Sequence, residues 1–240
     1  MFLNKKAFTL GELLMALGII GVISVLIMPQ IVAGRLSSQA KSEFNTAYAN
    51  ISRAISEMES DDITASDTKY STENSFYPVL KKYFNVVYDC GSNIPSGPNQ
   101  VCLSSSDAGK YSTVDGRSIS KSNYTLFDNG SFVTNNGMLI MIENGSNSAG
   151  NPYGLLISVD INGKSKPPNK YGWDLFTFEV SDGQIIPAGA TGSKYEAWRD
   201  EPQKYCDTSS SEVPIEQAGV TCSYYALSND DYFKERYNRR

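Results

Sequence analysis

Few side chains of this chain could do chemistry, and the first is an acid inside an apolar stretch. Glu12 is the only charged residue between Lys6 and Arg35. A carboxylate inside a bilayer costs on the order of 2.5 kcal/mol or more unless it is paired or lies near the interface. Glu12 therefore has two interpretations. It complements the positive N-terminus of its own helix, or it is paired with a free amine beside it.

Cysteines are the next candidates, and the chain has four: Cys90, Cys102, Cys206 and Cys222. An even number of cysteines in a chain outside the cytoplasm indicates disulfides. Four cysteines allow three pairings, of which proximity in the sequence favours Cys90–Cys102 and Cys206–Cys222. Closing the second loop is worth about 3 kcal/mol in the loop-entropy model. Metal binding by these thiols is disfavoured, because the sequence has no Cys-x-x-Cys and no histidine.

Three oxygen-bearing side chains, Asp160, Asn162 and Asp174, could contribute ligands to a calcium ion. They do not belong to an EF-hand loop, because Lys164 stands where that loop has Asp or Asn. Ordinary turn chemistry explains the same residues without a metal. Calcium is the only cofactor that the sequence leaves open.

Enzymatic chemistry finds no support in the composition. Without histidine, the chain has no Ser-His-Asp or Cys-His arrangement and no histidine-containing zinc site. No Gly-x-x-x-x-Gly-Lys or Gly-x-Gly-x-x-Gly phosphate loop is present. The net charge of −5 also disfavours direct binding to nucleic acid. We expect a protein that is not an enzyme.

A long apolar segment positions Glu12. Between Glu12 and Arg35 lie 22 uncharged residues, enough for a helix to cross a hydrocarbon layer of about 30 Å. The lysine pair that precedes the segment should remain in the cytoplasm, which places the rest of the chain outside. Gly21 and Pro29 lie within the segment, and a proline there removes a backbone donor and favours a kink.

The helical pattern continues past Arg35 but becomes one-sided. Apolar side chains recur at steps of three and four residues, at Phe44, Tyr48, Ile51, Ile55 and Met58. This spacing predicts an amphipathic helix whose apolar stripe packs on a globular part. We therefore predict one long helix, with a membrane half at residues 8–34 and an amphipathic half at residues 35–60.

Residues 61–240, called the head below, carry strand signals in their middle part. Alternating or β-branched runs bounded by turn residues predict strands at 124–127, 131–133, 138–143, 154–161 and 174–180. The turn Asp128-Asn129-Gly130 would join the first two strands. Short polar connections indicate an antiparallel meander with one face against the helix. Residues 76–88 fit either a short helix or a strand, and residues 104–123 are predicted to be surface loop.

The stretch KKAFTLGELL and the apolar helix after it resemble the leader and N-terminus of type IV prepilins and type II secretion pseudopilins. The resemblance implies that prepilin peptidase cleaves between Ala7 and Phe8 and that Phe8 is then N-methylated. Glu12 becomes the fifth residue of the mature chain, and Gly21 and Pro29 match positions where such helices loosen. The chain differs from the family at Ala7, where most members have glycine. This difference bears on how efficiently the leader is cleaved, more than on the position of the cut.

Two segments of the head also resemble pilin-like proteins. The Asp160-x-Asn162-Gly turn, followed by Pro-Asn, Gly-x-Asp and an aromatic strand, is a pattern found in many of them. Residues 219–227, which contain Cys222, resemble the last strand of such heads. The resemblance thus implies an α+β, pilin-like fold in which a long N-terminal helix packs on an antiparallel sheet.

The resemblance implies that the chain assembles into a filament. Residues 1–7 would be a leader, and the precursor would span the inner (cytoplasmic) membrane once, with its head outside. It would then join copies of itself and other pilins in a periplasmic or cell-surface filament, of the type IV pilus or type II secretion pseudopilus kind. The implied partners are prepilin peptidase and an inner-membrane assembly platform with a cytoplasmic motor ATPase.

Two alternatives keep the same head but need no filament. The chain could be a membrane-anchored or secreted binding or adhesion protein that does not polymerise. It could also carry an ordinary secretory signal that ends before Arg35 and releases a soluble protein. Neither alternative gives Glu12 a task, and the apolar run is longer than a secretory signal needs.

Overall fold

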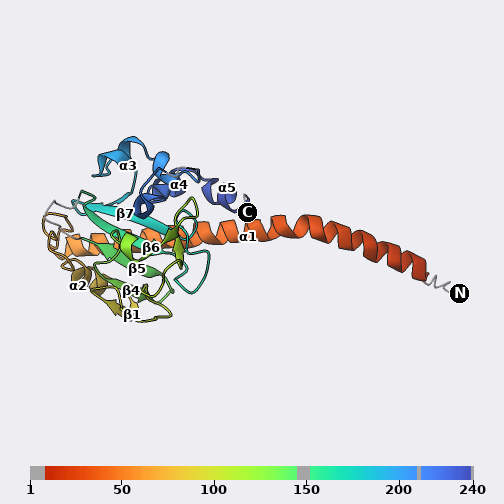
Figure 1. Ribbon diagram of the computed structural model, residues 1–240, viewed down its shortest axis with the longest axis horizontal. Coiled ribbons are helices and arrows are strands. Elements are labelled where there is room, and N and C mark those ends of the chain that lie inside the picture. Colours follow the sequence, from red (N-terminus) through yellow and green to blue (C-terminus); the bar gives the residue numbers. More distant parts are fainter. Residues whose placement is uncertain (1–8, 145–151, 210–211, 239–240) are drawn as a thin grey trace.

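The computed structural model describes residues 9–144, 152–209 and 212–238. Its longest element is helix α1 (Leu10–Ser60), which protrudes from the head for about half of its length (Figure 1). Thr9 caps the beginning of this helix, and the backbone N–H of Asp61 bonds to carbonyl groups of its last turn. The predicted single helix ending at residue 60 is confirmed.

The head contains a six-stranded antiparallel sheet in the order β1-β4-β5-β6-β7-β8. Its strands are β1 (Val86–Gly91), β4 (Ser131–Thr134), β5 (Leu139–Glu143), β6 (Leu155–Asp160), β7 (Leu175–Ser181) and β8 (Gln184–Pro187). Strands β4 to β8 pair in sequence order, as a meander does. A separate two-stranded sheet joins β2 (Tyr111–Ser112) to β3 (Ser118–Ile119).

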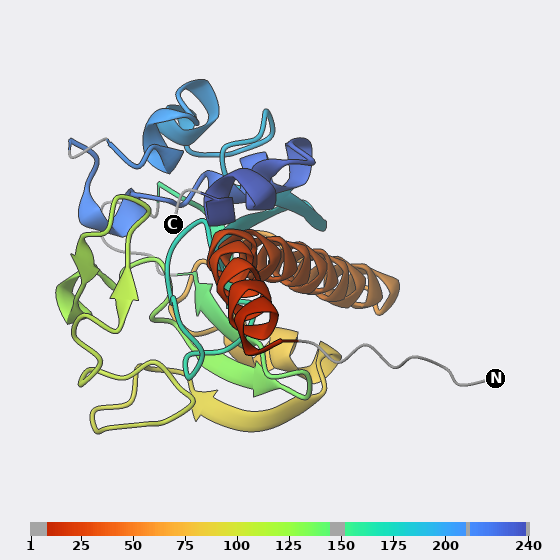
Figure 2. The same ribbon diagram turned by 90° about the vertical axis from the view of Figure 1, so that its right-hand side faces the viewer.

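The amphipathic half of α1 forms the centre of the core. Phe44 is completely buried, and its ring centroid lies 4.6 Å from that of Phe176 on β7 and 5.5 Å from that of Phe233. Ile51 and Met58 are also completely buried, whereas Tyr48 is half-buried at the edge of the stripe. Figure 2, which looks along the protruding end of α1, shows the sheet curving around one side of the helix.

Short helices cover the rest of the core. They are α2 (Tyr77–Leu80), α3 (Glu196–Asp200), α4 (Cys222–Ser228) and α5 (Tyr232–Asn238), with single 3₁₀ turns at Lys81–Tyr83, Lys121–Asn123, Lys204–Cys206 and Ile215–Gln217. Helix α5 packs against α1, and α4 packs against β7 and β8. Figure 1 shows α3, α4 and α5 on one side of the head and α2 on the other.

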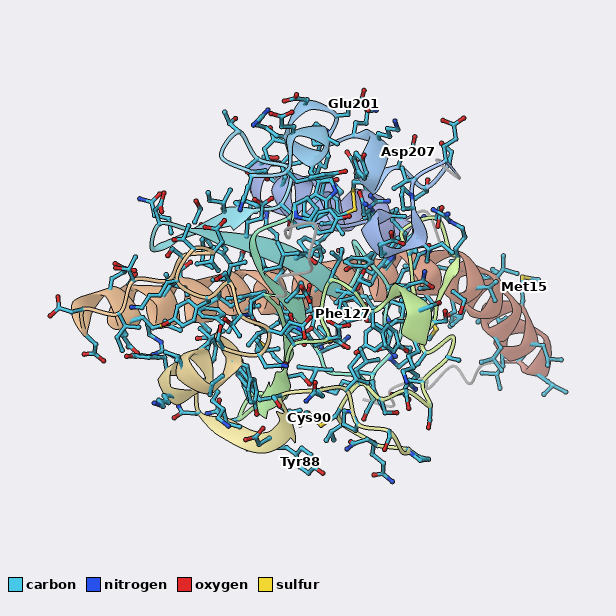
Figure 3. All side chains as sticks on the ribbon, turned by 60° about the vertical axis from the view of Figure 1, so that its left-hand side comes forward. Met15, Tyr88, Cys90, Phe127, Glu201 and Asp207 are labelled. Atoms are coloured by element: carbon cyan, nitrogen blue, oxygen red, sulfur yellow. A yellow bond between two sulfur atoms is a disulfide. The ribbon has the colours of Figure 1, made fainter. Side chains whose placement is uncertain are left out.

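The predicted strand at residues 124–127 is wrong. Leu126 and Phe127 are both buried, so this segment lacks the alternation of a half-buried strand and fills the core as turns (Figure 3). The neighbouring strand β4 pairs instead with β5 and with β1, which comes from the segment that the sequence left undecided. That segment contains α2, one 3₁₀ turn and the beginning of β1.

Two further predictions need correction. The segment around Cys222 forms helix α4 rather than a last strand, and its buried residues Cys222, Ser223 and Ala226 follow helical spacing. Residues 104–123 are not simply surface loop, because they form β2 and β3 and bury Tyr111 and Ile119. Strand β8 was not predicted. By contrast, the strands predicted at 131–133, 138–143, 154–161 and 174–180 correspond to β4 to β7.

Candidate functional site

The exposed half of α1 is the most unusual surface of the molecule. This helix, near the N-terminus, is long and apolar enough to span a membrane. Figure 3 shows Met15 projecting from it, away from the head. Among the described side chains of this helix, fifteen large apolar ones are exposed: Leu10, Leu13, Leu14, Met15, Leu17, Ile19, Ile20, Val22, Ile23, Val25, Ile27, Met28, Ile31, Val32 and Leu36. An apolar surface of this size is unfavourable in water and indicates a site of contact with a membrane or with another protein.

Glu12 lies at the free end of this surface and caps its own helix. The Glu12 N–H donates to Thr9 Oγ1 at 3.2 Å, and Glu12 Oε2 accepts from the Thr9 N–H and hydroxyl, both at 2.9 Å. This reciprocal capping box satisfies backbone donors that a helix N-terminus leaves unpaired. In the single chain, the Glu12 carboxylate therefore caps the N-terminus of its own helix, which is the first of the two interpretations that the sequence allowed.

The other predicted assembly residues lie along the same half of α1. A Cβ atom added at Gly21 would meet no atom within 4 Å, so none of the residues that the structure describes fills the space beside Gly21. The helix continues through position 29 without a break, and its protruding half bends away from the axis of the other half (Figure 1). The predicted cleavage site, Ala7 and Phe8, lies outside the described residues.

Both favoured disulfides are present, Cys90–Cys102 and Cys206–Cys222, and no described cysteine is free. The first joins β1 to a loop, across 5.7 Å between Cα atoms. The second joins the 3₁₀ turn Lys204–Cys206 to the first residue of α4, across 5.0 Å. Together they tie the loops on opposite sides of the head to its regular elements.

Asp160 and Asp174 come together beneath the loop between β6 and β7. Asp160 accepts hydrogen bonds from the Tyr111 hydroxyl at 2.6 Å and from the Gly163 N–H at 2.9 Å. Asp174 accepts from the backbone N–H groups of residues 169 and 170, at 2.8 and 2.6 Å. Asn162 connects the two acids, because its N–H faces Asp160 at 3.3 Å and its Nδ2 faces Asp174 at 3.5 Å.

This arrangement explains the three calcium candidates as loop anchors. Both carboxylates are buried, and burial followed by the charge of Asp174 raises the pKa of Asp160 well above its usual range. Burial likewise raises the pKa of Asp174. Every oxygen of the pair already accepts from the loop or from Tyr111. Within the described ranges, no group of three or more His, Cys, Asp or Glu side chains is placed to hold a metal ion.

Lys164 has a role that the sequence did not predict. It is 3% exposed, and its ammonium donates to the carbonyl oxygens of Asn99 and Cys102 and to Asp107, the last at 2.6 Å. This one side chain thereby fastens the loop closed by Cys90–Cys102 to the loop between β6 and β7. Its position in the turn that follows Asp160 was the only signal, and in the sequence that position argued only against an EF-hand.

Comparison with known proteins identifies no relative. No protein-family model, curated protein or solved structure matches this chain. Any functional assignment therefore depends on the residues and geometry described above.

Proposed function

We propose that this chain is a type IV pilin-like subunit, which is anchored in a membrane by α1 and assembles through that helix into a filament. The proposal covers type IV pili and type II secretion pseudopili alike. The observation that carries it is the exposed apolar half of α1, which ends in a single acid and has no partner surface on its own head among the described residues.

The chemistry of the helix end supplies a reason for ordered assembly. Cleavage before Phe8 would create a positively charged amine about 6 Å along the helix axis from Glu12. A neighbouring helix shifted by about that distance would place its amine against the Glu12 carboxylate. The amine would replace Thr9 as partner of Glu12, and two charges that are costly in a low dielectric would neutralise each other.

The remaining parts of the proposal follow from the anchor. The precursor would lie in the inner membrane with its head outside, where an oxidising compartment would maintain both disulfides. Prepilin peptidase would process it, and an assembly platform with a cytoplasmic motor ATPase would extract it from the membrane. Copies of the chain and other pilins would form the filament, whose surface would consist of heads.

The deciding experiment compares Glu12→Gln with Ser24→Ala in cells that contain the assembly machinery. Ser24 is a matched control, because it lies in the same apolar segment, is uncharged, and bonds only to the carbonyl of its own helix among the described residues. We expect Glu12→Gln to remain in the membrane but to lower the yield of sheared filaments at least about tenfold, as loss of a buried charge partner does. Ser24→Ala should assemble normally.

The same cells decide between the proposal and its alternatives. The N-terminal peptide of the purified protein should begin at Phe8 and carry one additional methyl group. A peptide that begins at Arg35 would indicate a secretory signal, and an intact Met1 would indicate a plain anchor. Normal filament yield from Glu12→Gln would refute the assembly role of the carboxylate.

A further inference from the structure

A pocket of about 390 Å³ opens beside the C-terminal disulfide. Cys206, Tyr232, Glu235 and Arg236 are among the residues that line it, and Cys222 is not. Cys206 is 7% exposed, whereas Cys222 is completely buried. Figure 3 places Asp207, the residue after Cys206, on the outer face of the head. A molecule from solution therefore reaches this disulfide from the side of Cys206.

A buried arginine lies against both sulfur atoms. Arg236 Nη2 donates to the Cys206 carbonyl at 3.0 Å and to Cys206 Sγ at 2.9 Å, and it lies 3.7 Å from Cys222 Sγ. The guanidinium carbon is also 5.1 Å from the ring centroids of both Trp173 and Tyr232. Only 9% of Arg236 is exposed.

The charge of Arg236 is incompletely compensated. Among the described residues, no carboxylate lies within ion-pair distance of its guanidinium. Asp207 lies near, but its carboxylate accepts from the N–H and hydroxyl of Ser209, at 2.9 and 2.8 Å. These bonds and, to a lesser extent, the Arg236 charge hold the pKa of Asp207 below its usual range. A buried cation of this kind is stabilised when a negative charge forms beside it.

We infer that Cys206–Cys222 is a thiol–disulfide exchange site, which an external dithiol enters through the pocket and which Arg236 activates. The external thiolate attacks Cys206 Sγ, the bond between Cys206 and Cys222 breaks, and its electron pair leaves with Cys222 as a thiolate. The second external thiolate then attacks the external sulfur of the mixed disulfide, and Cys206 leaves as a thiolate. The dithiol is oxidised to a disulfide, and its two protons end on Cys206 and Cys222.

Arg236 acts on both leaving groups. A cation beside a thiol lowers the pKa of that thiol, and a thiol of lower pKa leaves faster in exchange. The Cys222 thiolate would form 3.7 Å from Nη2, and the Cys206 thiolate 2.9 Å from it. The reverse sequence, with an oxidised dithiol protein, would form the same bond while the head folds.

The other disulfide provides an internal comparison. Cys90 is half-buried and thus more accessible than Cys206 (Figure 3 labels it close to Tyr88). No ammonium or guanidinium group of the described residues bonds to either sulfur of Cys90–Cys102, since Lys164 bonds there to a backbone carbonyl. Exposure alone predicts that Cys90–Cys102 is reduced first. Activation by Arg236 predicts the opposite order.

The test uses the full chain in detergent micelles and dithiothreitol as the dithiol. Samples are quenched with acid at intervals, alkylated and analysed by peptide mass spectrometry, so that the opening rate of each disulfide is measured in the same molecules. We expect Cys206–Cys222 to open first. Arg236→Gln should slow its opening about tenfold and leave the rate of Cys90–Cys102 unchanged. Arg199→Gln, which removes a partly exposed arginine bonded to Asp200, is the control and should change neither rate.

Two outcomes would overturn the inference: earlier opening of Cys90–Cys102 in the unmodified chain, or an unchanged ratio of the two rates in Arg236→Gln. If Arg236→Gln loosens the head, both disulfides will open faster, and Arg236→Lys then decides because it retains the charge. Arg236→Lys should keep Cys206–Cys222 as the first to open, and loss of that order would refute the role of the cation. None of these outcomes depends on filament formation.

Discussion

Three groups of buried ionisable side chains in the head have different partners. Lys164 is surrounded by carbonyl oxygens and one carboxylate. Asp160 and Asp174 accept hydrogen bonds from loop amides but lie together with no cation bonded to them among the described residues. Arg236 has two sulfur atoms, one carbonyl and two aromatic rings. Only the first arrangement brings opposite charges together. The Asp160–Asp174 pair should therefore make the stability of the head depend on pH, and Arg236 should make the neighbouring disulfide more reactive.

Asp160 should make the stability of the head depend on pH. Its pKa is raised in the folded state above the value of about 3.9 for an unfolded chain. The folded state is thus favoured most at low pH, and this contribution is lost as pH rises through the folded pKa. Asp174 acts in the same direction, as does Glu179, whose pKa burial raises to about 7. We expect the free energy of unfolding of the wild-type head to fall between about pH 5 and pH 8.

Asp160→Asn should flatten this dependence. The amide oxygen can still accept from residues 162 and 163, and Tyr111 can accept from the new amide. We expect the slope of unfolding free energy against pH to decrease by up to about 1.4 kcal/mol per pH unit, the limit for one titrating group. Urea unfolding in buffers from pH 5 to pH 8 measures the slope. Asp182→Asn, which removes an exposed carboxylate from the β7–β8 turn, is the control; an unchanged slope in Asp160→Asn would contradict the prediction.

Helix α1 connects two different environments. Its amphipathic half supplies core residues to the sheet and to α5, and its other half presents apolar side chains outward. One ion pair, Lys41 to Asp230 at 2.8 Å, links the helix to the turn before α5. That pair is highly exposed and contributes little. The attachment of the head to the helix therefore depends on packing, above all around Phe44.

Phe44→Ala should weaken the packing of the sheet and of α5 against the helix. Its ring contacts the rings of Phe176, Phe178 and Phe233, and its removal leaves a cavity between three elements. We expect the loss of about 3–5 kcal/mol of unfolding free energy, as measured by urea unfolding followed through tryptophan fluorescence. The neighbouring Asn45→Ala, on the exposed side of the helix, should cost less than about 0.5 kcal/mol. Equal costs for the two variants would show that the helix does not form the core.

At the scale of the whole molecule, the apolar half of α1 adds nothing to the core of the head. The described residues that form the core begin at Ala40, whereas the large apolar side chains that the structure describes between Leu10 and Leu36 are exposed. The half of α1 that contributes to the core of the head is thus separate from the half whose exposed apolar surface makes the chain insoluble in water. The two should be separable by truncation.

A chain that begins at Arg35 should fold as a soluble monomer. It retains the core residues of α1 and both disulfides, and it loses the surface that requires a membrane or a filament. We expect monomer behaviour in size-exclusion chromatography without detergent. Its melting temperature should agree with that of the full chain in micelles to within about 3 °C, a shift that corresponds to roughly 1 kcal/mol for a chain of this size. Aggregation or loss of cooperative melting would show that residues 9–34 contribute to the head.

The amino-acid sequence by itself determined the features that depend on local pattern. The long helix follows from one apolar run and one stripe at helical spacing, and strands β4 to β7 follow from short runs between turn residues. The two disulfides follow from the proximity of their cysteines along the chain. Each of these signals is contained within about twenty residues, so no distant partner was needed to interpret it.

Only the tertiary structure decided where distant segments meet. Strand β1 is recognisable once β4 pairs with it, and the segment after Cys222 is helical because it must cover β7 and β8. The sequence could not place Lys164 on the disulfide loop around 60 residues away, nor Arg236 against both sulfurs of Cys206–Cys222. Such contacts gain their energy from burial, and burial is a property of the whole packed chain rather than of any one segment.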